Sequence, residues 1–73
     1  MPDTTTQGYL NTKAGTTGNS KQQALNSLAG TTGKSSQDAA NTYAGTTKKT
    51  IQEALNSKAN KTGLSTQDAC KNL

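Results

Sequence analysis

The residues that could perform chemistry in this chain are few, and their spacing keeps them apart. The 73-residue sequence contains no histidine, which leaves no imidazole base, no catalytic triad and no histidine zinc site. Its four acidic residues are Asp3, Asp38, Glu53 and Asp68, and the last three recur at a step of fifteen residues. Catalytic carboxylates must converge at one site, whereas this regular spacing is typical of helix capping. We therefore expect no catalytic residue, no cofactor and no metal.

Three other short patterns have a functional and a structural interpretation. Gly33-Lys34-Ser35 is similar to the end of a phosphate-binding loop, but Leu28 stands where that loop needs another glycine. Asn60-Lys61-Thr62 fits a glycosylation sequon, yet nothing indicates secretion and a turn is the default interpretation. The single Cys70 cannot form an intramolecular disulfide, and other repeats hold Leu or Ala at its position. We predict a turn, a helix cap and a buried thiol in these places.

The composition gives the chain little material for a hydrophobic core. Hydrophobic residues make up 27% of the sequence, and they are mainly nine alanines and six leucines, with one isoleucine and no valine. Ordering a residue costs about 1.5 kcal/mol, while apolar burial returns about 25 cal/mol per Å². Alanine-rich faces are therefore not expected to stabilise a free monomer of this size. We expect the isolated chain to be disordered, or to be ordered by neighbouring copies or a large partner.

The charge pattern argues against nucleic acid and membrane as partners. The net charge is +4, and Lys48-Lys49 is the only adjacent pair among scattered lysines. Nucleic-acid-binding proteins usually concentrate their basic residues in a stripe. No apolar run approaches the roughly 20 residues of a membrane span, and no signal peptide is visible. The lysines are expected to solvate the surface.

A fifteen-residue repeat organises the chain from residue 5 onward. Glutamine recurs with this step, as do asparagine and alanine; the glutamines are Gln7, Gln22, Gln37, Gln52 and Gln67. We predict a polar lead at residues 1–4 and a five-repeat helical array at 5–73, with repeats starting near 5, 20, 35, 50 and 65. Each repeat is expected to form a helix of about nine residues and a link of about six.

Capping residues define both ends of each predicted helix. A hydroxyl residue opens every repeat; the first is Thr5, and the others are Ser20, Ser35, Thr50 and Ser65. Three residues later, the last four repeats carry a partner for a capping box, namely Gln23, Asp38, Glu53 and Asp68. The predicted C-caps are residues that tolerate a left-handed backbone, namely Gly15, Gly30, Gly45 and Asn60.

On a helical wheel, the apolar residues of each repeat form a narrow stripe flanked by asparagine and glutamine. The expected packing and oligomer face consists of Leu10, Leu25, Leu28, Tyr43, Ile51 and Leu55. Successive short helices joined by tight turns are expected to fold back on one another, with asparagine and glutamine bonding a neighbour's turn. The predicted fold class is all-α, a helix-turn-helix supercoil or solenoid-like rod in which packing supplies the stability that nine residues lack.

Residues 25–33, Leu-Asn-Ser-Leu-Ala-Gly-Thr-Thr-Gly, and the related segment at 38–47 resemble the tandem Ala-Gly-Thr-Thr-Gly segments of bacteriophage capsid-associated and fibre proteins. The resemblance covers residues 9–69; Lys48 replaces a turn glycine, and Asn60-Lys61 replaces Gly-Thr. The expected architecture is also similar to the stem of short-tailed phage head fibres, without a shared motif. Those fibres are homotrimers standing on the capsid.

The resemblance implies a non-enzymatic structural component of a phage virion, a fibre or decoration protein on the capsid surface. Its implied partners are its own copies, as a homotrimer, and the major capsid protein or another virion protein. Two alternatives remain open. One is a tail or fibre module that binds host-surface carbohydrate through its Thr-rich turns and through Tyr9 and Tyr43, although packing is the commoner role for such rings. The other is a basic nucleic-acid-associated protein, which would show a steep salt dependence of DNA affinity.

Overall fold

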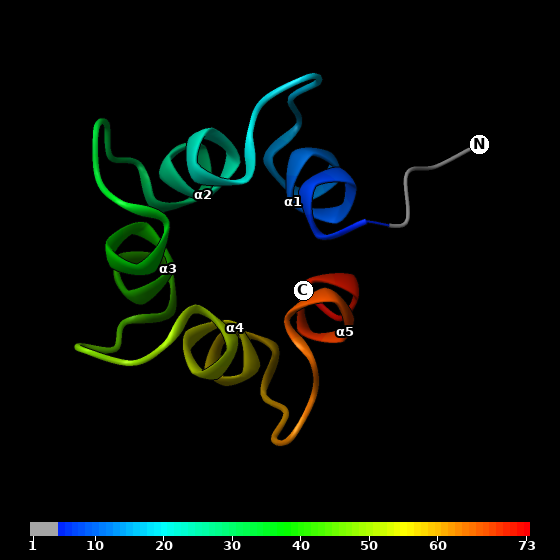
Figure 1. Cartoon of the computed structure of the whole chain (residues 1–73), viewed down its shortest axis with the longest axis vertical. Coiled ribbons are helices and arrows are strands. Elements are labelled where there is room, and N and C mark those ends of the chain that lie inside the picture. The colour runs from blue at the N-terminus through cyan, green and yellow to red at the C-terminus, as the bar shows by residue number, and fades with distance from the viewer. Residues whose placement is uncertain (1–4) are drawn as a thin grey trace.

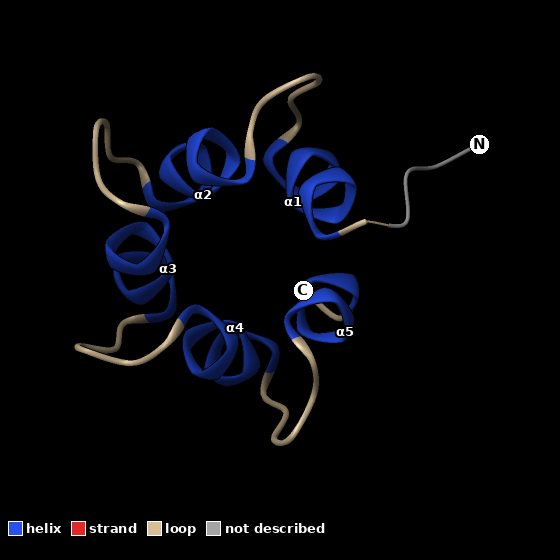
Figure 2. Ribbon diagram, in the orientation of Figure 1, coloured by secondary structure: helices blue, strands red, loops and turns tan. Residues whose placement is uncertain are grey.

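A computed structural model describes residues 5–73, and this part of the chain is all-helical (Figures 1 and 2). The five helices in it are α1 (Thr6–Ala14), α2 (Lys21–Ala29), α3 (Ser36–Ala44), α4 (Ile51–Ala59) and α5 (Thr66–Lys71). The prediction of an all-α chain is thus confirmed for the described residues. The predicted polar lead at 1–4 lies outside them.

The helices stand in a ring around a central axis, and α5 returns to lie beside α1 (Figure 1). Each helix packs on the next one along the chain, and the α1–α5 contact closes the circuit. The Cα atoms extend over 31 × 27 × 13 Å, so the molecule is a flat disc. Its thickness matches the roughly 13.5 Å length of a nine-residue helix. The helix axes therefore run along the short axis of the disc, and a rod would need several discs.

All the helices point in the same direction. Gln7, in the first turn of α1, donates from Nε2 to the carbonyl of Asn19 at 2.7 Å, and Asn19 directly precedes the N-cap of α2. Gln22 and Gln52 make the same bond to the ends of their own following links, at 2.8 Å each. The start of one helix therefore lies beside the start of the next.

The expectation that successive helices fold back on one another is wrong. Each six-residue link turns at the C-terminal end of one helix and runs outside the ring to the opposite end (Figure 2). The next helix then begins at the same end as the one before it. Six residues are long enough for this return because an extended chain spans about 3.3 Å per residue.

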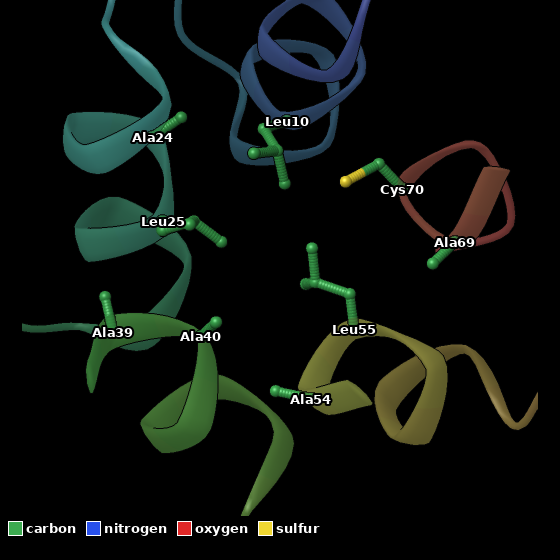
Figure 3. Close-up of a cluster of buried hydrophobic side chains, with 9 residues drawn as sticks. All are labelled: Leu10, Ala24, Leu25, Ala39, Ala40, Ala54, Leu55, Ala69 and Cys70. Carbon is green, nitrogen blue, oxygen red and sulfur yellow. The ribbon is translucent and has the colours of Figure 1, made fainter. Parts of the chain in front are cut away.

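The apolar stripes of all five helices meet at the centre of the ring (Figure 3). Leu10, Leu25 and Leu55 are fully buried there, and Ala40 and Cys70 hold the same register position on α3 and α5. Small residues also fill the adjoining register position on four helices, namely Ala24, Ala39, Ala54 and Ala69. The neighbours that cover each stripe are therefore the other helices of the same chain.

Candidate functional site

Each helix begins at a hydroxyl residue that caps it. The Ser20 hydroxyl accepts a hydrogen bond from the Gln23 amide at 3.2 Å, and Ser20 itself has an extended backbone. The predicted N-caps all occupy this position: Thr5 on α1, Ser35 on α3, Thr50 on α4 and Ser65 on α5. One of the otherwise unpaired amides of each first turn is thereby satisfied.

The full capping box forms in only two helices. Gln23 accepts from the Ser20 amide at 2.9 Å, and Glu53 accepts from the Thr50 amide at 3.0 Å. At Asp38 and Asp68 only the bond to the serine hydroxyl is present, so the prediction of four complete boxes is wrong for α3 and α5. An aspartate is one methylene shorter than a glutamate, and its carboxylate does not reach back to the N-cap amide.

Hydrogen bonding in the capping box of α4 also shifts the pKa of Glu53. The backbone amide of Thr50, followed by its hydroxyl, lowers the pKa of Glu53 because both donate to the ionised carboxylate. The nearby Lys49 charge acts in the same direction. The box in α4 is therefore a charged one, whereas Gln23 keeps the box in α2 neutral.

A left-handed residue ends each of the first four helices. The predicted C-caps Gly15, Gly30 and Gly45 have φ of 71–72°, and Asn60 has φ of 62°. The next residue donates its amide to a carbonyl five residues back, as in the 2.9 Å bond from Thr31 to Asn26, which is the Schellman arrangement. Each link contains a second left-handed position, and there the third link has Lys48, with φ of 57°.

Four buried asparagines fasten the links to the helices. Asn26 is 8% exposed and donates from Nδ2 to the carbonyls of Gln22 and Lys34, both at 2.9 Å. Its Oδ1 accepts from the Lys34 amide at 3.2 Å and from the Thr31 hydroxyl at 2.9 Å. One side chain thus binds both backbone groups of the residue eight positions later. We call this arrangement the asparagine clamp; its other members are Asn11, Asn41 and Asn56.

The clamp on the fourth repeat lacks one of its bonds. Asn56 binds the amide and carbonyl of Leu64 at 3.0 and 2.9 Å, as the others bind their own links. The threonine that donates a hydroxyl to the other three asparagines is replaced by Lys61. The Asn56 Oδ1 therefore loses this donor.

Sequence reasoning did not select these asparagines as site residues. It expected them to bond a neighbour's turn, whereas each one bonds the link that leaves its own helix. The available signal was the strict recurrence of asparagine at 11, 26, 41 and 56, followed five residues later by threonine in the first three repeats.

The C-terminal end of the ring carries apolar and basic side chains. Leu28, Tyr43 and Leu73 are half-buried and pack on the core from one turn beyond its central residues. The Lys58 ammonium lies 4.7 Å from the centroid of the Tyr43 ring, a cation–π contact between α4 and α3. Burial, and to a smaller extent the charge of a Cys70 thiolate, raise the pKa of Tyr43.

The N-terminal end of the ring differs in its chemistry. The acidic side chains of the described residues all lie there, in the first turns of three helices: Asp38, Glu53 and Asp68. Lys21 opens α2 at the same end, and Ile51 and Leu64 are half-buried against the core. The two ends of the disc are therefore not equivalent.

The structure divides the predicted packing and oligomer face into two groups. Leu10, Leu25 and Leu55 are fully buried inside one ring, so they contact other helices and not other chains. Leu28 and Tyr43 lie at the C-terminal end and Ile51 at the N-terminal end, where each keeps some exposure. Only this second group is accessible to another molecule.

Cys70 is a buried thiol at the centre of the ring, 3% exposed. Desolvation raises its pKa to about 11, against a small opposing effect of Lys21. The thiol is therefore neutral near pH 7, and it packs as a small hydrophobic side chain. Residues 5–73 contain no cluster of three or more His, Cys, Asp or Glu side chains that could hold a metal ion. Within the same range, no helix has the length and apolar character to cross a membrane.

Two polar grooves lie on the outside of the ring, between a helix and its links. One, of about 340 Å³, is lined by Asn19, Gln22, Gln23, Asn26, Ser27, Thr31, Thr32 and Gly33. The other, of about 300 Å³, repeats this arrangement around α4 and includes Lys49 and Lys61. Neither groove is lined by Tyr9 or Tyr43, so a sugar bound there would have no aromatic ring to stack on.

Comparison of the chain with protein-family models, with curated protein sequences and with solved structures found no match.

Proposed function

We propose that this chain is a non-enzymatic structural component of a phage virion, a fibre or decoration protein attached to the capsid surface. The observation that carries the proposal is the use of its buried polar groups. The four asparagine clamps bind the chain's own backbone, and no buried side-chain nitrogen or oxygen among the described residues lacks a partner. The polar side chains that the fold buries thus serve to fasten the chain, which supports a structural role. The assignment to a phage virion comes from the resemblance to phage Ala-Gly-Thr-Thr-Gly segments.

The same proposal includes a rod built from several copies of the chain. The resemblance to head-fibre stems implies three copies, a homotrimer. The ring covers its own apolar stripes, so further copies are not required to complete the core. Their role would be to extend a disc 13 Å thick into a longer rod. The partner at its base would be the major capsid protein or another virion protein.

Labelling of virus particles tests this function. An antibody raised against the purified chain is applied to particles isolated from a lysate that contains the protein, and gold-labelled particles are examined by electron microscopy. We expect label on the capsid surface and the chain among the proteins of purified particles. Absence of the chain from density-purified particles, with the protein recovered free in the lysate, would contradict the proposal.

The outer grooves support a second candidate, a fibre module that binds host-surface carbohydrate. Their amide and hydroxyl side chains are suited to sugar hydroxyl groups. A glycan array separates the two candidates. Glycan binding that is lost in Thr32→Ala, a groove residue outside the asparagine clamp, would favour the carbohydrate module, whereas no hit together with retained capsid binding would favour the structural role.

A further inference from the structure

The two ends of the disc differ in charge. The C-terminal end carries Lys13, Lys58 and Lys71 in the last helical turns, and Lys61 follows the α4 cap. No acidic side chain of the described residues accompanies them, because Asp38, Glu53 and Asp68 all lie at the N-terminal end. Lys21 opens α2, and Lys34 and Lys49 directly precede the N-caps of α3 and α4, so the N-terminal end holds both signs of charge. The disc therefore has one basic end and one mixed end.

From this arrangement we propose that copies of the chain stack head to tail along the disc axis, the N-terminal end of one against the C-terminal end of the next. The occupant of each end is a second copy of the same chain. The contact follows from the ring alone and does not depend on a place in a virion.

The parallel helices determine which side chains would meet. Because every helix runs along the axis, a translation without rotation places the start of each helix over the end of the same helix in the next copy (Figure 1). Lys58 reaches over the Tyr43 ring and so lies between the ends of α4 and α3. Asp38 and Glu53 of the next copy would lie opposite it. On α5, Asp68 would lie opposite Lys71.

Apolar surface and area are also consistent with this contact. Leu28, Tyr43 and Leu73 are half-buried at one end, and Ile51 and Leu64 at the other, so stacking would cover side chains that the ring leaves partly exposed. An ellipse with the diameters of the disc has an area of about 650 Å², close to the roughly 800 Å² that each partner buries in a stable interface. Two C-terminal ends brought together would oppose lysine to lysine, which is unfavourable.

Two charge-reversal variants test the stacking. The first is Asp38→Lys with Asp68→Lys, at positions where the carboxylate does not complete a capping box. The second is Lys58→Glu with Lys71→Glu. We expect the sedimentation coefficient of the wild-type chain to rise with concentration, and each variant alone to associate at least tenfold more weakly. An equimolar mixture should restore association, because the reversed end of one variant then meets the reversed end of the other.

The proposal would be overturned by a wild-type chain that stays a single disc up to millimolar concentration, by variants that associate as well as the wild type, or by a mixture that does not recover. A discrete trimer insensitive to these variants would also overturn it, and would leave the virion proposal intact. Capture of an acidic protein by the C-terminal end in place of a second copy would count against it as well. Far-UV circular dichroism verifies that both variants are folded, and Asp38→Asn with Asp68→Asn is a milder replacement for the first variant.

Discussion

At the scale of single residues, the third link contains a lysine in a backbone conformation that the other links give to glycine. Lys48 has φ of 57°, while Gly18, Gly33 and Gly63 have φ of 72–76° at the equivalent position. A side chain in this region costs about 1 kcal/mol, which glycine avoids. We predict that Lys48→Gly stabilises the fold by about 1 kcal/mol, or roughly 4–8 °C in Tm for a domain of this size, in a thermal melt.

The reverse substitution is the control. Gly33→Lys introduces the same residue into the second link, where nothing lies within 4 Å of an added Cβ. Its effect would therefore come from the backbone alone. A Tm lowered by a similar amount is expected, and an unchanged Tm in both variants would contradict the strain at position 48.

The incomplete asparagine clamp of the fourth repeat is a second place where a substitution should raise the stability. Lys61→Thr supplies the hydroxyl that Thr31 donates to Asn26 at 2.9 Å in the second repeat. One added hydrogen bond to a buried amide oxygen is worth about 1 kcal/mol. We predict a gain of this size in the free energy of unfolding, measured by urea denaturation.

Lys61→Val separates the hydroxyl from the change of shape. Valine matches threonine in volume and branching but donates no hydrogen bond. Equal gains from threonine and valine would show that removal of the lysine, and not the clamp, is responsible.

Burial of the Cys70 thiol makes stability sensitive to alkaline pH. Its folded pKa of about 11 lies above the ordinary value of 9.0, so the folded state retains the proton more strongly than the unfolded state. The resulting stabilisation is complete below pH 9 and is lost as the pH rises towards 11. We predict a loss of roughly 2–3 kcal/mol over this interval, at about 1.4 kcal/mol per pH unit.

Cys70→Ala isolates this titration, because alanine already occupies the equivalent core position at Ala40. Every other titratable side chain is common to both proteins, so the difference between the two stability curves reports on the thiol and its coupling to Tyr43. Parallel curves between pH 9 and 11 would contradict the prediction.

At the scale of helices, the acidic residues in the first turns of α3 and α4 can be exchanged. Asp38→Glu lengthens the side chain by one methylene, which should complete the box as Glu53 does in α4. We predict a gain of about 0.5 kcal/mol, since single capping features contribute this order of magnitude. Thermal denaturation followed at 222 nm measures it.

The reciprocal variant Glu53→Asp should lower the stability by breaking the existing box. If Asp38→Glu and Glu53→Asp change the Tm in the same direction, side-chain length is not the cause.

The caps also explain how much of the fold could be predicted at this scale. Hydroxyl and glycine residues at a fifteen-residue step predict where helices start and stop, because each cap acts within one turn of its own chain. The direction of the next helix was not predictable in this way. A six-residue link can lead to an antiparallel helix or run back to the start of a parallel one. The hydrogen bonds of Gln22 and Asn26 to the Lys34 backbone determine that the next helix is parallel.

At the scale of the whole molecule, closure of the ring removes the weak ends that an open array has. Leu10 on the first helix is as completely buried as Leu25 on the second, because α5 packs on α1. We predict that Leu10→Ala and Leu25→Ala destabilise the chain by similar amounts, each about 2–5 kcal/mol. In an open array the terminal repeat would tolerate the change better.

Native-state hydrogen exchange verifies the same point without mutation. The amides of α1 should be protected as strongly as those of α3 if the ring opens in a single cooperative step. Fast exchange confined to α1 and α5 would indicate that the α1–α5 contact opens on its own.

The closed ring itself could not be read from one repeat. A helical wheel shows that Leu25 and Ala24 share a face, but the angle between neighbours depends on how closely the small Ala24, Ala39, Ala54 and Ala69 let the helices approach. Closure is the sum of these angles over the whole chain. The candidate site could be predicted only in part for the same reason. The caps depend on local sequence, whereas the two ends of the disc exist only after the ring has closed.

The parallel arrangement of the helices also gives the molecule an electrical direction. Peptide dipoles of about 3.5 D add within each helix, and no antiparallel helix of the described residues cancels them, so the helix backbones together contribute roughly 150 D along the disc axis, positive at the N-terminal end. Antiparallel helical hairpins of the same length would have almost none. The lysines at the C-terminal end oppose this backbone dipole, so an anionic surface is attracted by the peptide groups of one end and by the side chains of the other.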